Sequence, residues 1–256
     1  LKFLESKHIL GSVTTQLFMK NANSRVSKLF YTSDLGNFDN EYFIADTQLA
    51  PTSSTVSIYE STYASREKEF VSKKLRQNEL KQIERVIEKT INRGGSCLFP
   101  TFSLSRTPTM LMYIKQIIDK NEKLSGLKIV VDGRLCNELL DVYEKICTGR
   151  NAKYIKEILE WENLIRIRSY KDTVKMCDDR ESKIILSNAG FLQVGHITTY
   201  ARQMLPNKNN TIIFTGYAPP DSPAGKLKNK HISGQKTIKM DGSIVFINAE
   251  IASFNS

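Results

Sequence analysis

The middle of the chain alternates short apolar runs with longer amphipathic segments, and this alternation limits the fold more than any other feature of the sequence. The runs are rich in β-branched residues, and the segments between them place apolar residues three and four positions apart. Because parallel strands need helical crossovers, the pattern predicts an α/β fold with a mostly parallel sheet flanked by helices. We expect strands at 96–100, 128–132, 165–167, 183–187 and 211–216, and helices at 66–93, 107–121, 138–146 and 197–205.

The two ends of the chain have a different, β-rich pattern. Residues 9–19 and 28–32 are apolar runs separated by a polar stretch, which predicts two strands joined by a turn. Residues 55–59 predict a further strand, and residues 231–256 return to short β-type runs without an obvious helix. The sequence therefore predicts a β-rich N-terminal segment followed by a larger α/β part.

Composition limits the class of protein. A chain of 256 residues, 40% hydrophobic and 25% charged, is typical of a soluble globular protein with one large core or two modest ones. Its apolar runs are far shorter than the roughly 20 residues of a membrane span, and its opening residues lack the pattern of a secretory signal. The four cysteines are widely spaced without a CxxC pair, which predicts reduced thiols, a cytoplasmic location and no zinc held by sulfur.

The formal net charge of +10 favours a polyanionic partner, because Lys and Arg side chains that neutralise phosphates release bound counterions. The alternative is that the lysines of the helix expected at 66–93 only form a solvated face. Charge alone does not decide between the two interpretations.

Three residues of the N-terminal segment have the chemistry of metal ligands or acid–base groups. His8 precedes an apolar strand, and Asp34 and Glu60 each end one. Imidazole and carboxylate are ligand types that suit hydrolytic zinc. Each residue also has an ordinary interpretation: a structural or exposed histidine for His8, a turn residue for Asp34, and a helix N-cap or surface acid for Glu60. Singly, none of the three indicates a site.

The order and surroundings of these residues resemble the β-CASP family of the metallo-β-lactamase superfamily, which includes RNase J and the endonuclease of pre-mRNA 3′-end cleavage. KHILGS is similar to the family element G-H-hydrophobic-L-G-[AS], with Lys7 where glycine is usual, and YTSDLGN to Y-[TS]-G-D, with Ser33 in place of glycine. ESTYASRE is similar to E-S-T-Y-[GA]-x-R. Further family blocks resemble, in the same order, GGSCLFPTFSLSRTPTML, the segment from IILSNAGF to GYAPPDSPAGKL, and the ends SGQK and ASFNS.

The resemblance covers essentially the whole chain and implies a domain organisation. Residues 1–64 would be an incomplete metallo-β-lactamase αββα domain, residues 65–252 an inserted β-CASP domain, and residues 253–256 the start of the return to the first domain. The family's H-x-H-x-D-H run is absent from the sequence, and His8 and Asp34 alone would not hold two zinc ions. We therefore expect the missing ligands in flanking sequence and expect the 256 residues alone to be inactive.

The resemblance also implies a reaction, the hydrolysis of phosphodiester bonds in RNA. In the complete site, Asp34 would bridge two zinc ions, His8 would bind one of them, and Glu60 would hold a histidine expected after Ser256, which would act as the general acid. The substrate would be single-stranded RNA, no membrane would be involved, and a homodimer is an option. A non-catalytic RNA-binding or scaffold subunit, a DNA-acting relative and a basic domain for another anion stay open as alternatives, as does the choice between endonuclease and exonuclease.

The head of the helix expected after residue 100 carries candidates for contact with nucleic acid. Arg106 follows Ser103 and Ser105. An arginine with neighbouring hydroxyls suits the two-pronged recognition of phosphate, although a structural salt bridge would give the same pattern.

Two later positions are further candidates for nucleic-acid contact. His196 begins a predicted helix, where free backbone N–H groups suit phosphate, with capping or packing as the alternative. Lys226 ends the loop APPDSPAGK, in which small residues such as Gly225 suit a close approach of the backbone. His231 is expected to be exposed.

Overall fold

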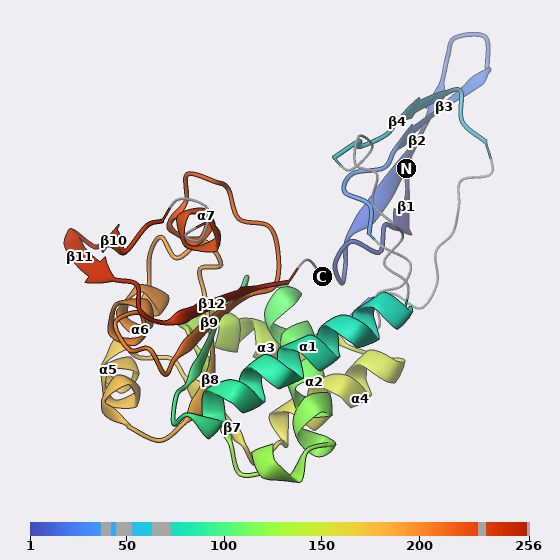
Figure 1. Cartoon of the computed structure of the whole chain (residues 1–256). Helices are drawn as coiled ribbons and strands as arrows, with labels where there is room; N and C mark the ends of the chain where they lie inside the picture. The colour runs from blue at the N-terminus through green and yellow to red at the C-terminus, as the bar shows by residue number, and fades with distance from the viewer. Residues whose placement is uncertain (37–41, 45–52, 63–72, 230–233, 255–256) are drawn as a thin grey trace. The chain divides into compact units, whose positions relative to one another are not determined.

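The computed structural model describes residues 1–36, 42–44, 53–62, 73–229 and 234–254. The chain divides into two compact units, Leu1–Lys73 and Lys74–Ser256 (Figure 1). The domain boundary expected between residues 64 and 65 falls outside the described residues, so it stays a prediction. Within the described ranges, every helix is too short or too polar to cross a lipid bilayer.

The first unit is a four-stranded sheet in the order β1-β2-β3-β4. Its strands are β1 (Lys2–Glu5), β2 (Val13–Lys20), β3 (Val26–Tyr31) and β4 (Val56–Ile58). Strands β1, β2 and β3 pair antiparallel, and β4 joins β3 in parallel. The hairpin between β2 and β3 confirms the expected strand pair, but the run expected as a strand over 9–19 begins as a turn in which Ser12 N–H donates to the Ile9 carbonyl.

The second unit is built on a six-stranded sheet in the order β12-β9-β5-β8-β6-β7, and every pair in it is parallel. Nearly all residues of its four central strands are buried, which is why they appear in the sequence as continuous apolar runs. The strands are β5 (Cys97–Pro100), β6 (Lys128–Asp132), β7 (Leu164–Ile167), β8 (Lys183–Ser187), β9 (Thr211–Phe214) and β12 (Glu250–Ser253).

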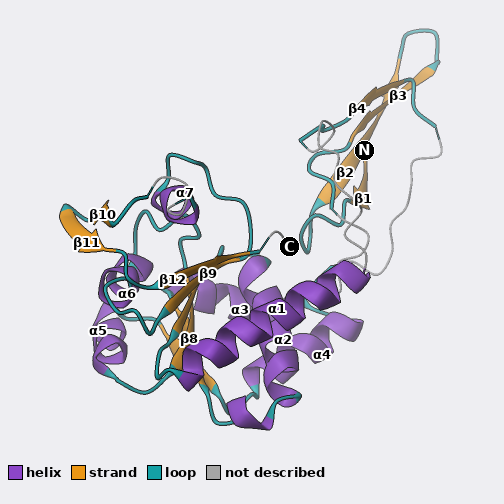
Figure 2. Cartoon of the chain, viewed as in Figure 1, coloured by secondary structure: helices purple, strands orange, loops and turns teal. Residues whose placement is uncertain are grey.

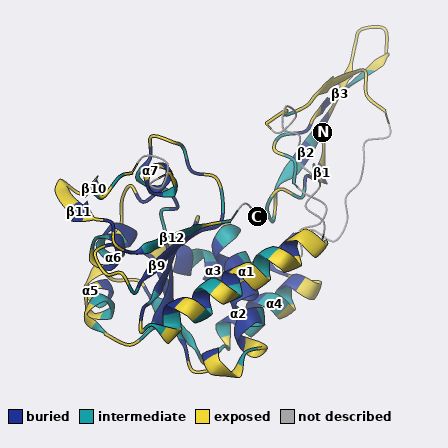
Figure 3. Ribbon diagram, viewed as in Figure 1, coloured by how far each residue is buried: buried dark blue, intermediate teal, exposed yellow. Residues whose placement is uncertain are grey.

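Helices cover both faces of this sheet (Figure 2). Those on one side are α1 (Lys73–Asn92), α2 (Arg106–Asp119), α3 (Arg134–Ile146) and α4 (Gly149–Leu159), and those on the other are α5 (Tyr170–Asp178) and α6 (His196–Met204). A short helix α7 (Pro223–Lys228) and a separate antiparallel pair, β10 (Thr237–Met240) and β11 (Ser243–Phe246), complete the unit. The buried sheet between amphipathic helices confirms the predicted fold class (Figure 3).

Strand order determines where this sheet can hold a ligand. The chain leaves β5 through α2 toward β6, whereas it leaves the neighbouring β8 through α6 toward β9, in the opposite direction along the sheet. Right-handed crossovers in opposite directions put α2 and α6 on opposite faces. The loops that follow β5 and β8 therefore separate at the carboxyl edge of the sheet, and such switch points are where open α/β sheets bind ligands.

Two helices lie where the sequence predicted none, and a third lies where it predicted a loop. The segment between residues 147 and 182 contains α4 and α5, for which no helix was expected. In the Pro/Gly-rich stretch, the Ser222 side chain caps α7 by accepting a hydrogen bond from Gly225 N–H, and Pro223 occupies the first turn. A serine followed by proline is a helix start, and this signal was present in the sequence.

Arg93 joins the end of α1 to the amino edge of the sheet. Its guanidinium donates to Asn209 O at 2.6 Å, to the Glu250 carboxylate at 2.7 Å, and to Asn210 O and Thr211 Oγ1 at 3.1 and 2.7 Å. Only a planar fork of donors can make all of these bonds at once.

We expect Arg93→Ala to lower the free energy of unfolding of the second unit by about 2 kcal/mol, because hydrogen bonds to charged groups are worth about that much. Arg93→Lys is expected to recover less than half of the loss, since an ammonium group lacks the fork. Urea denaturation followed by the fluorescence of Trp161, the single tryptophan, measures the effect. Arg85→Ala, an exposed site on the same helix, is the control; equal effects of the two alanine variants would contradict the prediction.

Asp179, between α5 and β8, gives the second unit a pH-dependent contribution. A hydrogen bond from Glu181 N–H, assisted by one from the Lys128 ammonium, lowers the pKa of Asp179 from 3.8 to about 2. A carboxyl whose folded pKa is depressed stabilises the fold above its ordinary pKa and loses this contribution as the pH falls through the folded value.

We therefore expect the stability difference between the unsubstituted protein and Asp179→Asn to be constant at neutral pH and to vanish as the pH falls from about 4 to about 2. The difference at neutral pH is at most about 1 kcal/mol, because Asp179 and Lys128, which form an ion pair, are both partly exposed. Urea denaturation across this pH range tests it. Asp178→Asn, at the exposed neighbouring aspartate, should show no such pH-dependent difference; if it does, the contribution is not specific to Asp179.

Candidate functional site

The three motif segments of the first unit lie against one another. Gly36 N–H donates to the Ser6 carbonyl at 2.9 Å, which joins the segment after β3 to the turn that holds His8. A Cβ atom at Gly36 would lie 1.6 Å from the Lys7 carbonyl oxygen, so only glycine permits this contact. The Glu60 carboxylate accepts from Leu35 N–H at 3.3 Å, next to Asp34 in the chain.

Glu60 is held as an ionised carboxylate in this cluster. Hydrogen bonds from Thr62, then one from Leu35 N–H, lower the pKa of Glu60, and the nearby charge of His8 lowers it further. The backbone N–H of Glu60 donates to Thr32 Oγ1 at 3.0 Å, which fixes the chain where it leaves β4. His8 and Asp34 are exposed and Glu60 is partly exposed, so all three are open to solvent.

A complete zinc site is not formed by the described part of the chain. Among those residues, no group of three or more His, Cys, Asp or Glu side chains is placed to hold a metal ion. A catalytic zinc takes three protein ligands. His8 and Asp34 have the right donor atoms, but they are too few for such a centre.

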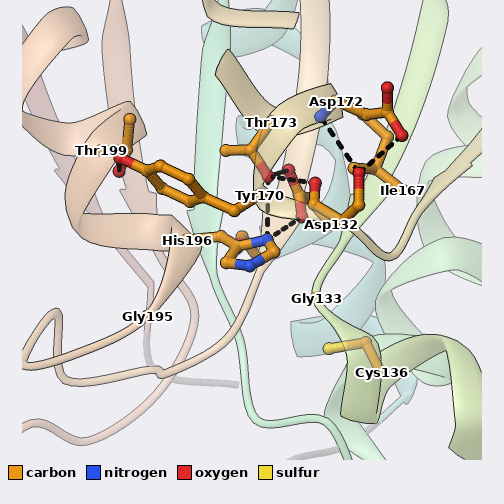
Figure 4. Close-up of polar contacts among 12 residues, drawn as sticks. Asp132, Gly133, Cys136, Ile167, Tyr170, Asp172, Thr173, Gly195, His196 and Thr199 are labelled. Atoms are coloured by element: carbon orange, nitrogen blue, oxygen red, sulfur yellow. Dashed lines mark hydrogen bonds and ion pairs between the residues drawn. The ribbon is translucent and has the colours of Figure 1, made fainter. Parts of the chain in front are cut away.

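The second unit contains a polar cluster around Asp132 that was not predicted from the sequence (Figure 4). Asp132 ends β6, is fully buried and lies 2.6 Å from His196 Nδ1 through its Oδ1 atom. Its Oδ2 atom accepts hydrogen bonds from Thr173 at 2.7 Å and Tyr200 at 2.6 Å. A carboxylate only accepts, so Nδ1 of His196 carries the proton in this contact.

The surroundings of His196 combine burial with access to solvent. The His196 side chain is 22% exposed, and its ring meets that of Tyr170 edge-on with centroids 5.7 Å apart. Burial, followed by the charge of Asp132, raises the pKa of Tyr200, so its phenol stays a donor. The carboxylate at the end of the apolar run KIVVD was the sequence signal for this cluster, because the ends of parallel strands meet at one edge.

Ser103, Ser105 and Arg106 follow β5 at the same carboxyl edge, and their environments differ. Ser103 is buried, and its hydroxyl accepts from the Cys136 thiol at 3.2 Å. Ser105 is the N-cap residue of α2, with φ of 61° and no side-chain cap. Arg106 is partly exposed, and a Cβ atom at Gly216 would lie 3.7 Å from its Nη2 atom, so Arg106 faces the loop after β9.

The loop after β9 differs from expectation in its details. Lys226 is exposed on α7, whereas the Lys228 ammonium donates to the Gly216 carbonyl at 2.7 Å. The close approach expected at Gly225 is to the chain itself, because a Cβ atom there would lie 2.0 Å from the Pro219 carbonyl oxygen. His231 lies outside the described residues.

Comparison with known proteins relates the chain to a family of nucleases. The family model described as Beta-Casp domain matches residues 107–227. The RNase J-like protein of Methanocaldococcus jannaschii is 30% identical over 84% of this chain and 48% of its own length. Endoribonuclease ysh1 of Schizosaccharomyces pombe is 25% identical over 90% of this chain and 30% of its own length. Ribonuclease TTHA0252 of Thermus thermophilus is 23% identical over 98% of this chain and 55% of its own length.

These matches cover nearly the whole chain, which spans between 30% and 55% of the length of the three relatives. The matched region extends from α2 to α7 and contains the Asp132 cluster. Together with the parallel sheet and the ordered motifs, the comparisons identify the chain as a member of the β-CASP family of the metallo-β-lactamase superfamily.

Proposed function

We propose that the whole protein to which this chain belongs hydrolyses phosphodiester bonds of RNA. The observation that carries the proposal is that the three motif segments meet. The Glu60 carboxylate accepts a hydrogen bond from Leu35, the residue after Asp34, and the nearby charge of His8 lowers the pKa of Glu60. The relatives named Endoribonuclease ysh1 and Ribonuclease TTHA0252 support RNA as the substrate class.

The chemistry that we assign to this cluster needs metal ions and further ligands. Bound zinc ions supply Lewis acidity and lower the pKa of a water molecule. We assign His8 and Asp34 as two of the ligands of a two-zinc centre. Glu60, ionised and held by two backbone N–H groups, is suited to fix the position of a protonated histidine that gives its proton to the leaving oxygen.

The net charge of +10 supports binding of the RNA backbone, and exposed rings on the loops of the second unit support a single-stranded substrate, since unpaired bases stack on aromatic side chains. Arg106, Ser105, His196 and Lys226 are the residues that we assign to this contact. Ser103 joins them only if its bond with Cys136 opens. A homodimer and a cytoplasmic location stay predictions.

Incubating the full-length protein with labelled single-stranded RNA tests the proposal directly. We expect shorter products in the presence of zinc and intact RNA in the presence of a chelator. Tight binding without cleavage under both conditions would instead support the non-catalytic RNA-binding alternative. Cleavage of single-stranded DNA with equal efficiency would support the DNA-acting alternative.

A further inference from the structure

Tyr170 exposes a large part of its ring beside His196, at the carboxyl edge of the six-stranded sheet. It begins α5, is 54% exposed, and contacts the His196 ring edge-on at an interplanar angle of 66°. Such a contact covers at most one face of the tyrosine ring, so the other face is free of this neighbour. The ring thus offers a flat apolar surface to solvent next to a polar group.

His196 is oriented so that one ring nitrogen faces inward and the other is left for a ligand. Nδ1 lies 2.6 Å from Asp132 Oδ1 and 2.8 Å from the Thr173 hydroxyl. Figure 4 shows the second ring nitrogen on the side away from Asp132. Since Asp132 and Thr173 are both fully buried, the imidazole is anchored at one edge and partly open at the other.

The start of α6 adds further hydrogen-bond donors beside the His196 ring. Gly195, with φ of +90°, precedes the helix, and no side chain caps it. The first backbone N–H groups of a helix lack partners within the helix and favour negative charge. An anchored imidazole, an uncapped helix start and an exposed aromatic ring therefore occur together, and they match the phosphate and the base of one nucleotide.

We infer that Tyr170 and His196 form a nucleotide subsite for single-stranded RNA. The base stacks on the Tyr170 ring, and His196, as an imidazolium whose Nδ1–H is held by Asp132, donates its Nε2–H to a backbone phosphate. Asp132 is a positioning residue that holds the imidazole through Nδ1. The choice of RNA rests on the proposed function, whereas the pairing of a stacking ring with a phosphate donor rests on the contacts above.

Fluorescence anisotropy with a short labelled oligouridine, in the presence of a chelator so that nothing is cleaved, tests the subsite. Tyr170→Ala should weaken binding by roughly 5- to 100-fold, the range for loss of one stacked base. His196→Gln should weaken it by about 10-fold through loss of a charge-assisted hydrogen bond. Phe246→Ala is the matched control, since Phe246 is 62% exposed on the separate β10–β11 pair.

An abasic oligomer of ribose phosphates separates the two roles. On this probe Tyr170→Ala should have no effect, while His196→Gln should still weaken binding. Asp132→Asn should weaken oligouridine binding to the level of His196→Gln, and the double variant should show no further loss, because both changes remove one contact. If Asp132 instead had only a structural role, the double variant should bind oligouridine more weakly than His196→Gln alone.

Two results would overturn the inference: equal effects of Tyr170→Ala and Phe246→Ala, or unchanged binding by His196→Gln. If the exposed ring is instead a contact for a protein partner, the first of these is the outcome. The nuclease proposal is tested separately, because cleavage by the unsubstituted protein does not depend on these variants, and the subsite stands if RNA is bound but not cleaved.

Discussion

Replacing Asp34 with alanine is expected to reduce RNA cleavage by the full-length protein by about a thousand-fold or more, since a catalytic metal supplies several kcal/mol of transition-state stabilisation. The carboxylate follows β3 and adjoins Leu35, whose N–H is bonded to Glu60. Losing it removes one of the ligands that we assign to the zinc centre and leaves the sheet itself intact.

Zinc content gives a readout of this prediction that does not depend on activity. Metal analysis of the purified Asp34→Ala protein should show less bound zinc than the unsubstituted protein. Glu5→Ala, which removes an exposed carboxylate from β1 of the same sheet, is the control and should change neither zinc content nor cleavage. If Asp34→Ala also leaves both unchanged, Asp34 is not a ligand and the assignment of the cluster is wrong.

The sheet of the second unit was predictable because the pattern that identifies a buried strand lies within a few consecutive residues. Strands buried on both faces need continuous apolar runs, so β5, β6 and β8 were expected within one residue of their observed bounds. Helix α1 was equally clear, since its apolar residues recur with the helical period and end at Gly94. Strand β12 was harder to place, because it joins the sheet by pairing with β9. More than thirty residues separate these two strands in the chain.

Two of the places where the prediction failed have weak or misleading local signals. Helix α5 spans only nine residues and buries a single one, Thr173, so its apolar period is nearly absent. Residues 9–12 are apolar enough for a strand, yet Ser12 closes a turn with Ile9. In both places, hydrogen bonds decide the structure over the apolar pattern.

The candidate sites also differ in how far they could be predicted from the sequence. His8, Asp34 and Glu60 were found because each lies in a recognisable motif, and the hydrogen bonds among their segments agree with that prediction without testing the assigned roles. Asp132 and Tyr200 are 68 residues apart, and no local pattern relates them. Only the return of the chain to adjacent strands brings such residues together.

Replacing Asp132 with alanine is expected to lower the free energy of unfolding of the second unit by about 3–5 kcal/mol, the usual cost of breaking a buried charged pair. The carboxylate accepts from His196, Thr173 and Tyr200, and the last two are almost completely buried, so water cannot replace the lost acceptor. Asp132→Asn keeps the shape and one acceptor and should cost about half as much.

A second substitution shows whether unsatisfied donors cause this loss. In the Asp132→Ala background, Tyr200→Phe removes one buried hydroxyl that has no acceptor, so it should be neutral or stabilising, because apolar replacement of both partners costs little. In the otherwise unsubstituted protein the same change should destabilise by about 1 kcal/mol. Urea denaturation followed by Trp161 fluorescence gives all four stabilities. Equal effects of Tyr200→Phe in both backgrounds would mean that the loss reflects a cavity at position 132, not hydrogen bonding.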